Sequence, residues 1–455
     1  MRLSFFGAAR EVTGSCVRVE VADAEGKARQ MLIDCGLFQG EQAAAGKNGE
    51  PFGFDPKALN AVFVTHAHAD HTGRLPKLIK EGYAGAFYMT EPTLALTRLV
   101  LEDAFQIMQQ EAEESGAPLL YSKEDLESAL ANMRPVNYHQ AIEFAQGISV
   151  MFHDAGHILG SAYISVEAEG KRVIFSGDIG NNDVPILPET EPISRADAVV
   201  CESTYGDRLH ESAEERSTKL RAAIEQTVKN RGVLLIPAFS IERTQELLYE
   251  IHLLLERFKT NVPIYLDSPM AIRATQAYRH FKQFLQFDAP IFGEQGHDFF
   301  SFPNLRETLT IDESKVINDA KRPKIIIAGS GMMTGGRILH HLSRYVNQKF
   351  AMILIIGFQA AGTLGRRIFN KEPQVTIFGQ RFDLRATVKA IGAFSAHGDQ
   401  AKLARWLHPD EGPVPKKVLL VHGDWGVQEA FAEHLRTALA GSEITIPEAG
   451  KMYEI

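Results

Sequence analysis

The sequence is poor in cysteine and has no long apolar run. Only Cys16, Cys35 and Cys201 occur among its 455 residues, and an odd, small number without regular spacing argues against a disulfide framework and for reduced thiols. No run approaches the roughly 20 consecutive apolar residues that a membrane-spanning helix requires, and residues 1–14 lack the apolar core of an export signal. We therefore expect a cytoplasmic protein with no membrane partner.

Acidic residues outnumber basic ones in the whole chain but not in its middle. The formal net charge is −9, which by itself argues against a nucleic-acid partner. Residues 209–394, however, contain 25 Lys and Arg against 18 Asp and Glu, a charge of +7, and the remainder carries −16. A basic middle beside an acidic remainder fits a segment that contacts a polyanion while another holds cations. Taken alone, the charge distribution is better explained by chance asymmetry between two solvated surfaces.

The first two hundred residues repeatedly place polar residues after short β-branched runs. Such runs are typical of strands, and loops beyond strand ends often carry chemistry because a rigid sheet positions their side chains. Helical sequence lies between them, and Ser122 followed by Asp125 resembles a capping box at the start of one helix. The predicted strands cover 31–33, 61–65, 173–175 and 198–201, and the predicted helices cover 91–115 and 122–133.

From about residue 209 strands alternate with helices, which indicates an α/β layer with a largely parallel sheet. Two later strand ends precede histidines, His397 and His422. A chain of this length is expected to form two or three packed units. The predicted strands cover 232–236, 263–266, 324–328, 351–356, 391–394 and 418–421, and the predicted helices include 243–258 and 338–345.

Four residues that can bind metal ions lie within one six-residue stretch, as His66, His68, Asp70 and His71. Imidazole and carboxylate together suit zinc or a similar divalent ion. A single buried histidine is usually structural, but four such groups this close would each need a separate polar partner if they were only packed. The pattern therefore predicts a metal site on a loop that enters a helix.

One loop cannot complete two coordination shells, and three further residues are candidates to do so. His157, Asp178 and His422 each follow an apolar run at a turn that contains glycine. Each alone is equally well read as an ordinary turn residue. Asp178 fits a bridging carboxylate, since one anion between two cations relieves their repulsion. Two metal ions at such a distance suit hydrolysis of a phosphodiester bond.

In order along the chain, these motifs resemble the metallo-β-lactamase fold, and Glu202, His397 and His422 resemble the three added motifs of the β-CASP nucleases. Residues 237–240, 265–270 and 330–337 are also similar to that family. The resemblance implies an α/β fold: a metallo-β-lactamase αββα sandwich with an inserted α/β β-CASP domain. The implied domains are 1–208 and 395–455, the two parts of the metallo-β-lactamase domain, and 209–394, the β-CASP domain, with the active site in the cleft between the two domains.

The resemblance also assigns ligands to two zinc ions. One ion would be held by His66, His68 and His157, the other by Asp70, His71 and His422, with Asp178 between them. Asp34 would orient ligand imidazoles from the outer shell, and we count it and Asp70 among the catalytic residues.

A departing sugar oxygen needs a proton, and by resemblance His397 is the general acid that supplies it. A carboxylate that hydrogen-bonds a histidine raises its pKa into a useful range, and Glu202 would be that partner. Taken singly, Glu202 fits a carboxylate at a helix N-terminus, and His397 fits a neighbour of an N-cap.

The loop of Ser330, Gly331 and Met332 is the predicted substrate-binding segment. It follows a strand and precedes a helix, and backbone N–H groups at such a place can bind a phosphate. A plain turn explains the same glycines, and the loop lacks the lysine and spacing of a P-loop.

We expect a zinc-dependent ribonuclease that cuts single-stranded RNA, principally as an endonuclease. Exonuclease activity is a further expectation. In the family, RNA-acting members carry His at the last motif and DNA-acting members carry Val; this chain has His422. It resembles the prokaryotic homologues of the pre-mRNA 3′-end-processing endonuclease, and a homodimer is one expectation from the family. The alternatives are a DNA-acting β-CASP nuclease, a small-molecule hydrolase of the same fold, and a non-catalytic binding subunit.

Overall fold

The computed structural model describes residues 1–455 except 41–45, 259, 287–297 and 409–413. The chain forms two compact units. The larger unit contains residues 1–182, 187–209 and 397–455, and the smaller unit contains 183–186 and 210–396. The smaller unit is therefore inserted into the larger one. The functional domain limits expected from the sequence remain a prediction, because compactness alone does not define a domain.

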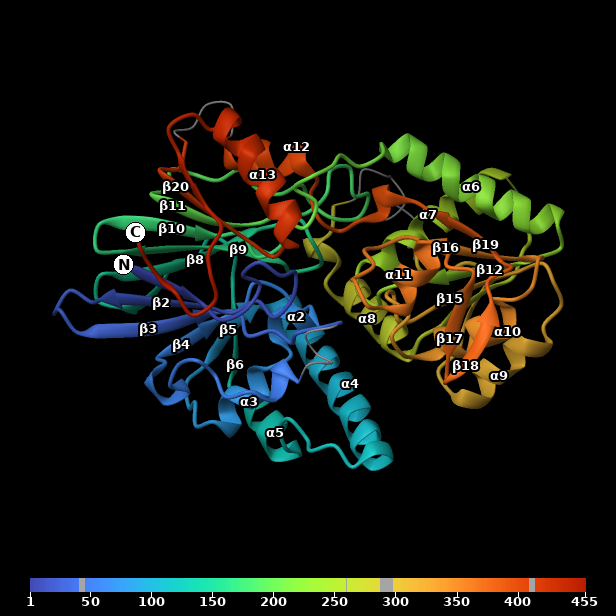
Figure 1. Ribbon diagram of the computed structural model, residues 1–455, viewed down its shortest axis with the longest axis horizontal. Coiled ribbons are helices and arrows are strands. Elements are labelled where there is room, and N and C mark those ends of the chain that lie inside the picture. Colours follow the sequence, from blue (N-terminus) through green and yellow to red (C-terminus); the bar gives the residue numbers. More distant parts are fainter. Residues whose placement is uncertain (41–45, 259, 287–297, 409–413) are drawn as a thin grey trace. The chain divides into compact units, whose positions relative to one another are not determined.

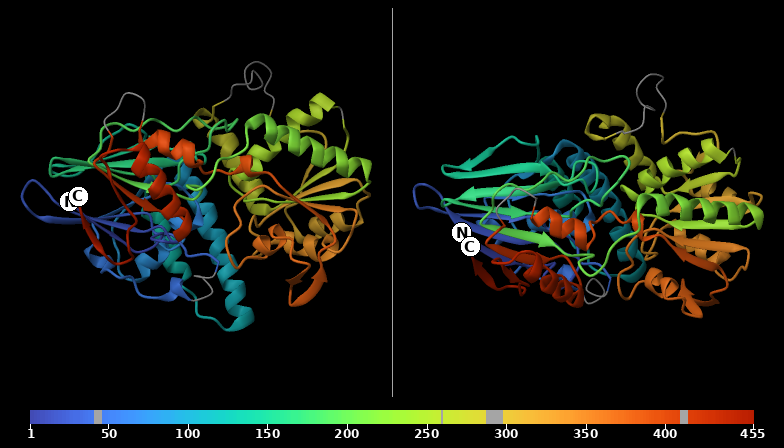
Figure 2. Two further views of the ribbon diagram at one scale, coloured as in Figure 1. Left: turned by 45° about the horizontal axis from the view of Figure 1, so that its top comes forward. Right: turned by 90° about the horizontal axis from the view of Figure 1, so that it is seen from above.

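The first sheet of the larger unit has seven strands and is antiparallel at one edge and parallel at the other. The chain termini meet at the antiparallel edge, where the last strand pairs with the first (Figure 2). In order across the sheet, the strands are β22 (Met452–Glu454), β1 (Arg2–Phe5), β2 (Val17–Ala22), β3 (Ala28–Ile33), β4 (Ala61–Phe63), β5 (Phe87–Thr90) and β6 (Met133–Val136).

The second sheet of this unit also has seven strands and mixed pairing. Its neighbours β10, β11, β20 and β21 run parallel to one another, and β7 to β10 form an antiparallel meander. In order, the strands are β21 (Glu443–Thr445), β20 (Lys417–Val421), β11 (Ala198–Glu202), β10 (Lys171–Phe175), β9 (Ala162–Ala168), β8 (Ile148–Asp154) and β7 (Ile142–Ala145).

The two sheets stack with helices on both outer faces, which is the predicted αββα sandwich (Figure 1). Alternate residues such as Phe63, Val166 and Leu419 fill the space between the sheets. The opposite faces of the strands pack against helices, because both faces of these central strands are apolar. The helices are α2 (Ala69–Thr72), α3 (Leu75–Lys80), α4 (Glu91–Ser115) and α5 (Lys123–Ala131) with the first sheet, and α12 (Gln400–Leu407) and α13 (Trp425–Ala438) with the second.

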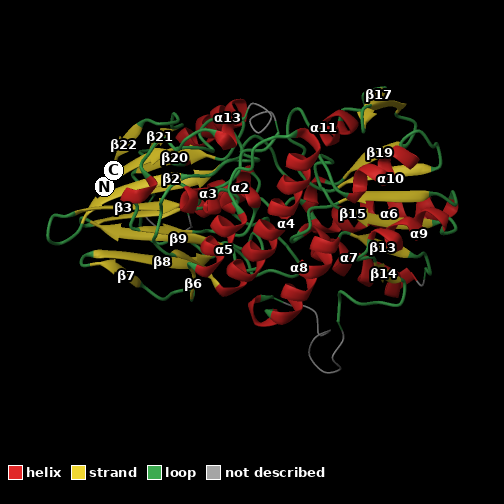
Figure 3. Ribbon diagram, turned by 90° about the horizontal axis from the view of Figure 1, so that it is seen from below, coloured by secondary structure: helices red, strands yellow, loops and turns green. Residues whose placement is uncertain are grey.

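The smaller unit is built on a parallel sheet of six strands with helices alternating along the chain (Figure 3). In order, its strands are β14 (Leu305–Glu307), β13 (Ile264–Asp267), β15 (Lys324–Ala328), β12 (Val233–Pro237), β16 (Ala351–Ile355) and β19 (Thr387–Ala390), beside a hairpin of β17 (Gln374–Ile377) and β18 (Gln380–Asp383). Its helices are α6 (Ala213–Lys229), α7 (Arg243–Phe258), α8 (Pro269–His280), α9 (Ile311–Asp319), α10 (Arg337–Tyr345) and α11 (Leu364–Phe369).

Most of the predicted elements are present, and one is wrong. The capping box at the start of α5 forms as expected, with the Ser122 hydroxyl accepting from Asp125 N–H and the Asp125 carboxylate accepting from Ser122 N–H. The strand expected at 391–394 is instead a 3₁₀ turn over Gly392–Phe394, and the strand ends earlier, at Ala390. Gly392 and Ala393 favour strands poorly, and Ser395 N–H closes the turn onto Gly392 O at 2.9 Å. Single 3₁₀ turns also cover Lys47–Gly49, Pro56–Ala58 and Lys282–Phe284.

No helix in the described part of the chain is long and apolar enough to cross a membrane.

The inter-sheet core should dominate the stability of the larger unit. Leu419 is fully buried between the two sheets, so Leu419→Ala is expected to cost about 2–5 kcal/mol, the usual result of removing a buried leucine side chain. Urea unfolding followed by circular dichroism measures this as a lower midpoint. Leu209→Ala is the matched control, because Leu209 is 65% exposed. Equal midpoints for the two variants would contradict the assignment of the core.

Candidate metal centre

The candidate residues all follow strands whose C-terminal ends lie at one edge of their sheet. In the first sheet β3 and β4 are parallel, and the chain leaves them at Asp34 and at the His66 loop. In the second sheet β8, β10, β11 and β20 point the same way, so the residues that follow them lie along one edge. The two edges are joined where Ala162 N–H donates to Thr65 O at 2.8 Å. Loops from both sheets therefore converge on one place.

The first group of donor atoms has the spacing of a tetrahedral zinc site. The Nδ1 atom of His68 lies 3.1 Å from His66 Nε2 and 3.2 Å from His157 Nε2. Asp178 Oδ2 lies 3.4 Å from His66 Nε2 and 3.5 Å from His157 Nε2. Ligand atoms at 2.0–2.2 Å from a tetrahedral ion are about 3.3–3.6 Å apart. These four side chains therefore fit one divalent ion.

The second group lies on the other side of the same carboxylate. Asp178 Oδ1 is 3.3 Å from His71 Nε2 and 3.6 Å from His422 Nε2. Asp70 Oδ2 is 3.3 Å from His422 Nε2. Each oxygen of Asp178 thus faces a different cluster of ligand atoms, which is the arrangement of a bridging carboxylate.

The surroundings of Asp178 support the presence of cations. This side chain is 1% exposed, and its Oδ1 atom accepts no hydrogen bond from the described residues. A buried anionic oxygen without a hydrogen-bond donor is costly unless positive charge compensates it. The donor set, with histidine nitrogens and carboxylate oxygens, is one that zinc prefers.

The ligand imidazoles are oriented from behind by oxygen atoms. Asp34 Oδ2 accepts a hydrogen bond from His71 Nδ1 at 2.8 Å. Thr65 in turn donates to Asp34, from its N–H at 2.7 Å and from its hydroxyl at 2.8 Å. The hydroxyl of Thr204 lies 3.0 Å from His422 Nδ1. The sequence analysis missed the two threonines, because threonine is common in strands and carries no metal-binding signal of its own.

Burial and neighbouring charges set the protonation of the cluster. Burial lowers the pKa of His66 well below its ordinary value and that of His68 to about 4. Burial also opposes ionisation of Asp178, but His422 and His71 outweigh it and hold its pKa well below the usual range. Neutral imidazole and ionised carboxylate are the forms that bind metal ions. Burial lowers the pKa of His71, but Asp178 and Asp34 outweigh it and raise that pKa well above normal, so binding of an ion there displaces a proton.

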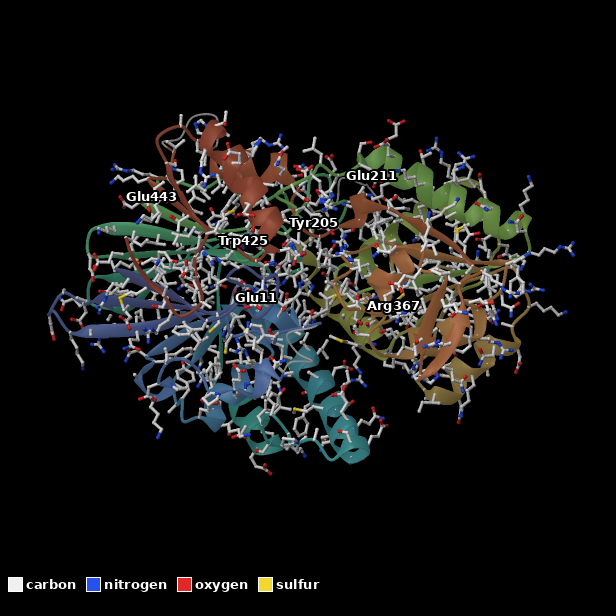
Figure 4. The ribbon with its side chains drawn as sticks, viewed as in Figure 1. Glu11, Tyr205, Glu211, Arg367, Trp425 and Glu443 are labelled. Atoms are coloured by element: carbon white, nitrogen blue, oxygen red, sulfur yellow. The ribbon has the colours of Figure 1, made fainter. Side chains whose placement is uncertain are left out.

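His397 lies beside the cluster and is paired with Glu202. Its Nδ1 atom is 3.2 and 3.1 Å from the two carboxylate oxygens of Glu202, which is fully buried and also accepts from Ile179 N–H at 2.7 Å. Burial lowers the pKa of His397, but Glu202 and then Asp178 outweigh it and raise the pKa to about 9. Bound cations would lower that value towards neutrality. The ring of Tyr205, which is labelled in Figure 4, lies 6.2 Å from that of His397, centre to centre.

The predicted substrate-binding residues belong to the smaller unit. Ser330, Gly331 and Met332 follow β15 and precede α10. A Cβ atom at Gly331 would lie 2.6 Å from the ring of Phe239, so only glycine allows this close packing. The Ser330 hydroxyl accepts from Thr334 N–H at 3.2 Å. Phosphate binding by this loop stays a prediction.

Three family models match the chain. The model described as the metallo-β-lactamase superfamily matches residues 10–237. The Beta-Casp domain matches residues 244–368. The Zn-dependent metallo-hydrolase RNA specificity domain matches residues 381–447.

Several curated proteins and a solved structure are similar over nearly the whole chain. Ribonuclease TTHA0252 of Thermus thermophilus is 39% identical over 99% of both chains. Transcription termination factor FttA of Methanocaldococcus jannaschii is 32% identical over 96% of this chain and 69% of its own. Cleavage and polyadenylation specificity factor 73 of Drosophila melanogaster is 28% identical over 93% of this chain and 60% of its own. A crystal structure of a protein of unknown function from Enterococcus faecalis covers 99% of both chains with a TM-score of 0.54 at 11% identity, which supports the fold alone.

The carboxylate of Asp34 should tune the affinity of the centre for metal ions. Asp34→Asn keeps the size of the side chain but removes the charge that faces His71 Nδ1. Loss of such an outer-shell partner typically weakens metal binding by about 10–100-fold. Competition with a chromogenic zinc chelator measures the change. Asp319→Asn, at an exposed carboxylate in α9, is the control. Affinity unchanged in Asp34→Asn would show that Asp34 does not orient a ligand.

Proposed function

Because this chain belongs to the metallo-β-lactamase superfamily and carries its β-CASP and RNA-specificity domains, as its motifs predicted, we propose that it is a zinc-dependent endoribonuclease. The paired donor clusters around Asp178 carry this proposal. A binding subunit would not need a complete set of ligands together with a histidine–carboxylate pair, and all of these lie in the larger unit.

The two clusters support the ligand assignments that the family resemblance implies. His66, His68 and His157 would hold one zinc ion, Asp70, His71 and His422 the other, and Asp178 would bridge them. Such a pair supplies a nucleophile from water at neutral pH and stabilises the charge that develops on the phosphoryl oxygens. The protein's own contribution is rigidity, since Asp34, Thr65 and Thr204 hold ligand imidazoles in place from the outer shell. Asp34, Thr65, Thr204 and Asp178 already have the positions that keep the ligands oriented, so these side chains require no rearrangement.

His397 would supply the proton that the departing sugar oxygen needs. Its Nδ1 faces Glu202, so the protonated ring directs Nδ1–H to that carboxylate and keeps Nε2–H for the leaving group. When the P–O bond breaks, the Nε2 proton passes to the sugar oxygen and the ring becomes neutral. Glu202 is held by Ile179 N–H, and this fixes the orientation of the acid.

RNA is the substrate that the comparisons favour. The match to an RNA specificity domain covers the region around His397 and His422. Relatives named as a ribonuclease, as a transcription termination factor and as a cleavage and polyadenylation factor cover almost all of this chain. A small-molecule hydrolase would leave the β-CASP domain without a purpose. Internal cleavage is our finer proposal, with a cytoplasmic location and single-stranded RNA as the partner.

Substrate choice is tested with end-labelled, single-stranded RNA and DNA of one sequence. The zinc-loaded protein, dialysed against a mild chelator, should retain two zinc ions per chain, as two-metal chemistry requires, and should cut RNA internally. A strong chelator should abolish cleavage and added zinc should restore it. Equal cleavage of DNA would contradict the assignment of RNA. Release of single nucleotides from one end alone would replace the endonuclease with an exonuclease.

The role of His397 is tested separately from metal binding. His397→Ala should lower kcat by about 10²–10⁴-fold, the usual contribution of a general acid, while the zinc content stays at the wild-type level. Glu202→Gln should lower kcat less, because the ring remains. His434→Ala, which removes an exposed histidine from α13, is the control. Wild-type turnover in His397→Ala would show that another group donates the proton.

A further inference from the structure

The larger unit holds a second cluster of metal-binding side chains, outside the candidate centre. His139, His153 and Glu191 place their donor atoms within 4.8 Å of one another. His139 Nε2 lies 2.8 Å from Glu191 Oε1, and His153 Nδ1 lies 3.8 Å from Glu191 Oε2. We propose that these three residues form a separate site for zinc or a similar divalent ion. This proposal does not depend on the proposed nuclease function.

The hydrogen bonds of His153 leave the correct nitrogen for a metal ion. Its Nε2 atom lies 3.1 Å from the Ser165 hydroxyl, which also accepts from Arg172 Nη2 at 3.4 Å. In the tautomer of His153 that donates Nε2–H to the Ser165 hydroxyl, the Nδ1 lone pair faces Glu191 and is available to a metal ion. The ring stacks on Tyr163 with centroids 4.6 Å apart and an interplanar angle of 8°. A metal-binding histidine typically has its other nitrogen fixed in this way.

The charges around this cluster suit a cation. Burial lowers the pKa of His153 to about 4, so its imidazole is neutral at pH 7 and free to act as a ligand. Glu191 supplies a carboxylate. Arg172 is the opposing positive group, but it contacts Ser165, on the side of the ring away from Glu191. Asp154 adds a further carboxyl nearby, whose pKa burial raises to about 7.

The exposure of the cluster leaves room for an ion to enter. The side chain of His139 is 60% exposed and that of Glu191 is 32% exposed, whereas His153 is 11% exposed. An ion would replace the hydrogen bond between His139 and Glu191, whose donor atoms, now 2.8 Å apart, would separate by about half an ångström to reach the spacing of two ligands on one ion. Water would fill the remaining coordination positions, as it does at open zinc sites.

The three ligands come from three separate segments, and one of them supports the candidate centre. His139 follows β6, His153 lies in β8, and Glu191 lies in a segment that contacts the loop leading to His157. In that segment the Thr190 hydroxyl donates to Ala155 O at 2.9 Å, and Glu191 N–H donates to Asp154 O at 3.0 Å.

The approach is close, because a Cβ atom at Gly156 would lie 2.7 Å from Pro188 O. An ion at the cluster would therefore tie this segment to the strand that positions His157.

The site is tested by counting zinc in the full-length protein. Equilibrium dialysis against chelator-buffered zinc should load the wild-type chain with one ion more than His139→Ala or Glu191→Gln. Both changes are at exposed or half-exposed side chains, so neither should prevent folding. His434→Ala, at an exposed histidine outside every cluster, is the matched control and should bind as the wild type does.

A second measurement locates the additional ion. The indole N–H of Trp406 donates to Glu191 O at 3.0 Å, and the centre of its ring lies 5.5 Å from the centre of the Tyr163 ring. The other tryptophan, Trp425 at the start of α13 (Figure 4), is removed by Trp425→Phe. In that background Cu²⁺, which binds such ligands more tightly than zinc, should quench Trp406 emission at a concentration at least tenfold lower than when His139→Ala is also present.

Two results would overturn the proposal. One is an equal zinc content in wild type, His139→Ala, Glu191→Gln and His434→Ala at every buffered concentration. The other is Cu²⁺ quenching of Trp406 that does not depend on His139. In either case His139 and Glu191 form only a solvent-exposed hydrogen bond, which contributes little by itself. RNA cleavage can succeed or fail without affecting either readout, so the proposed function is judged separately.

Discussion

The buried carboxylate of Asp178 is the constraint on which the larger unit's centre depends. A fully desolvated anion between His71, His66 and their neighbours is favourable only while positive charge lies on both sides of it. Its two oxygens face two separate groups of ligands, so neither group is complete without it. The αββα sandwich provides the geometry, because strand ends from two stacked sheets deliver loops to opposite sides of this one side chain. The rigid core between those sheets fixes the positions of the loops relative to one another.

The side chains of this centre differ in how deeply they are buried. Five candidate ligands, His66, His71, His157, Asp178 and His422, are almost completely buried, and Asp34, Thr65 and Thr204 contact this group from the outer shell. The side chains of Asp70 and His397 are each 16% exposed, and Nδ1 of His397 faces Glu202. The acid role proposed for His397 requires such access, because a general acid exchanges its proton with substrate and solvent in every turnover. His397 is thus more exposed than Asp178, which is 1% exposed, although only 3.8 Å separates His397 Nδ1 from Asp178 Oδ2.

Much of the centre could be predicted from sequence, because residues that bind metal ions have few other reasons to occur two residues apart after a strand. The same reasoning placed His157, Asp178 and His422 only with the help of the family resemblance, since each alone fits a turn. Sequence reasoning could not find Thr65 or Thr204, because their roles depend on which imidazole ring lies opposite each hydroxyl. The prediction of a strand at 391–394 was wrong. Its four residues, Ile-Gly-Ala-Phe, contain apolar side chains, but a turn that closes onto Gly392 satisfies their backbone hydrogen bonds better. The sandwich followed from apolar runs with two buried faces.

The two candidate metal-binding clusters of the larger unit differ in how completely the fold positions their donor atoms before an ion binds. At the candidate centre the donor atoms already lie 3.1–3.6 Å apart in a dry environment, so an ion enters without ordering any side chain. At His139 and Glu191 the exposed side chains must give up a hydrogen bond and lose rotational freedom before they bind. The proposed second site would therefore hold an ion more weakly than the centre around Asp178 and exchange it faster. An ion held in that way would respond to the free zinc concentration, whereas ions bound around Asp178 would remain in place.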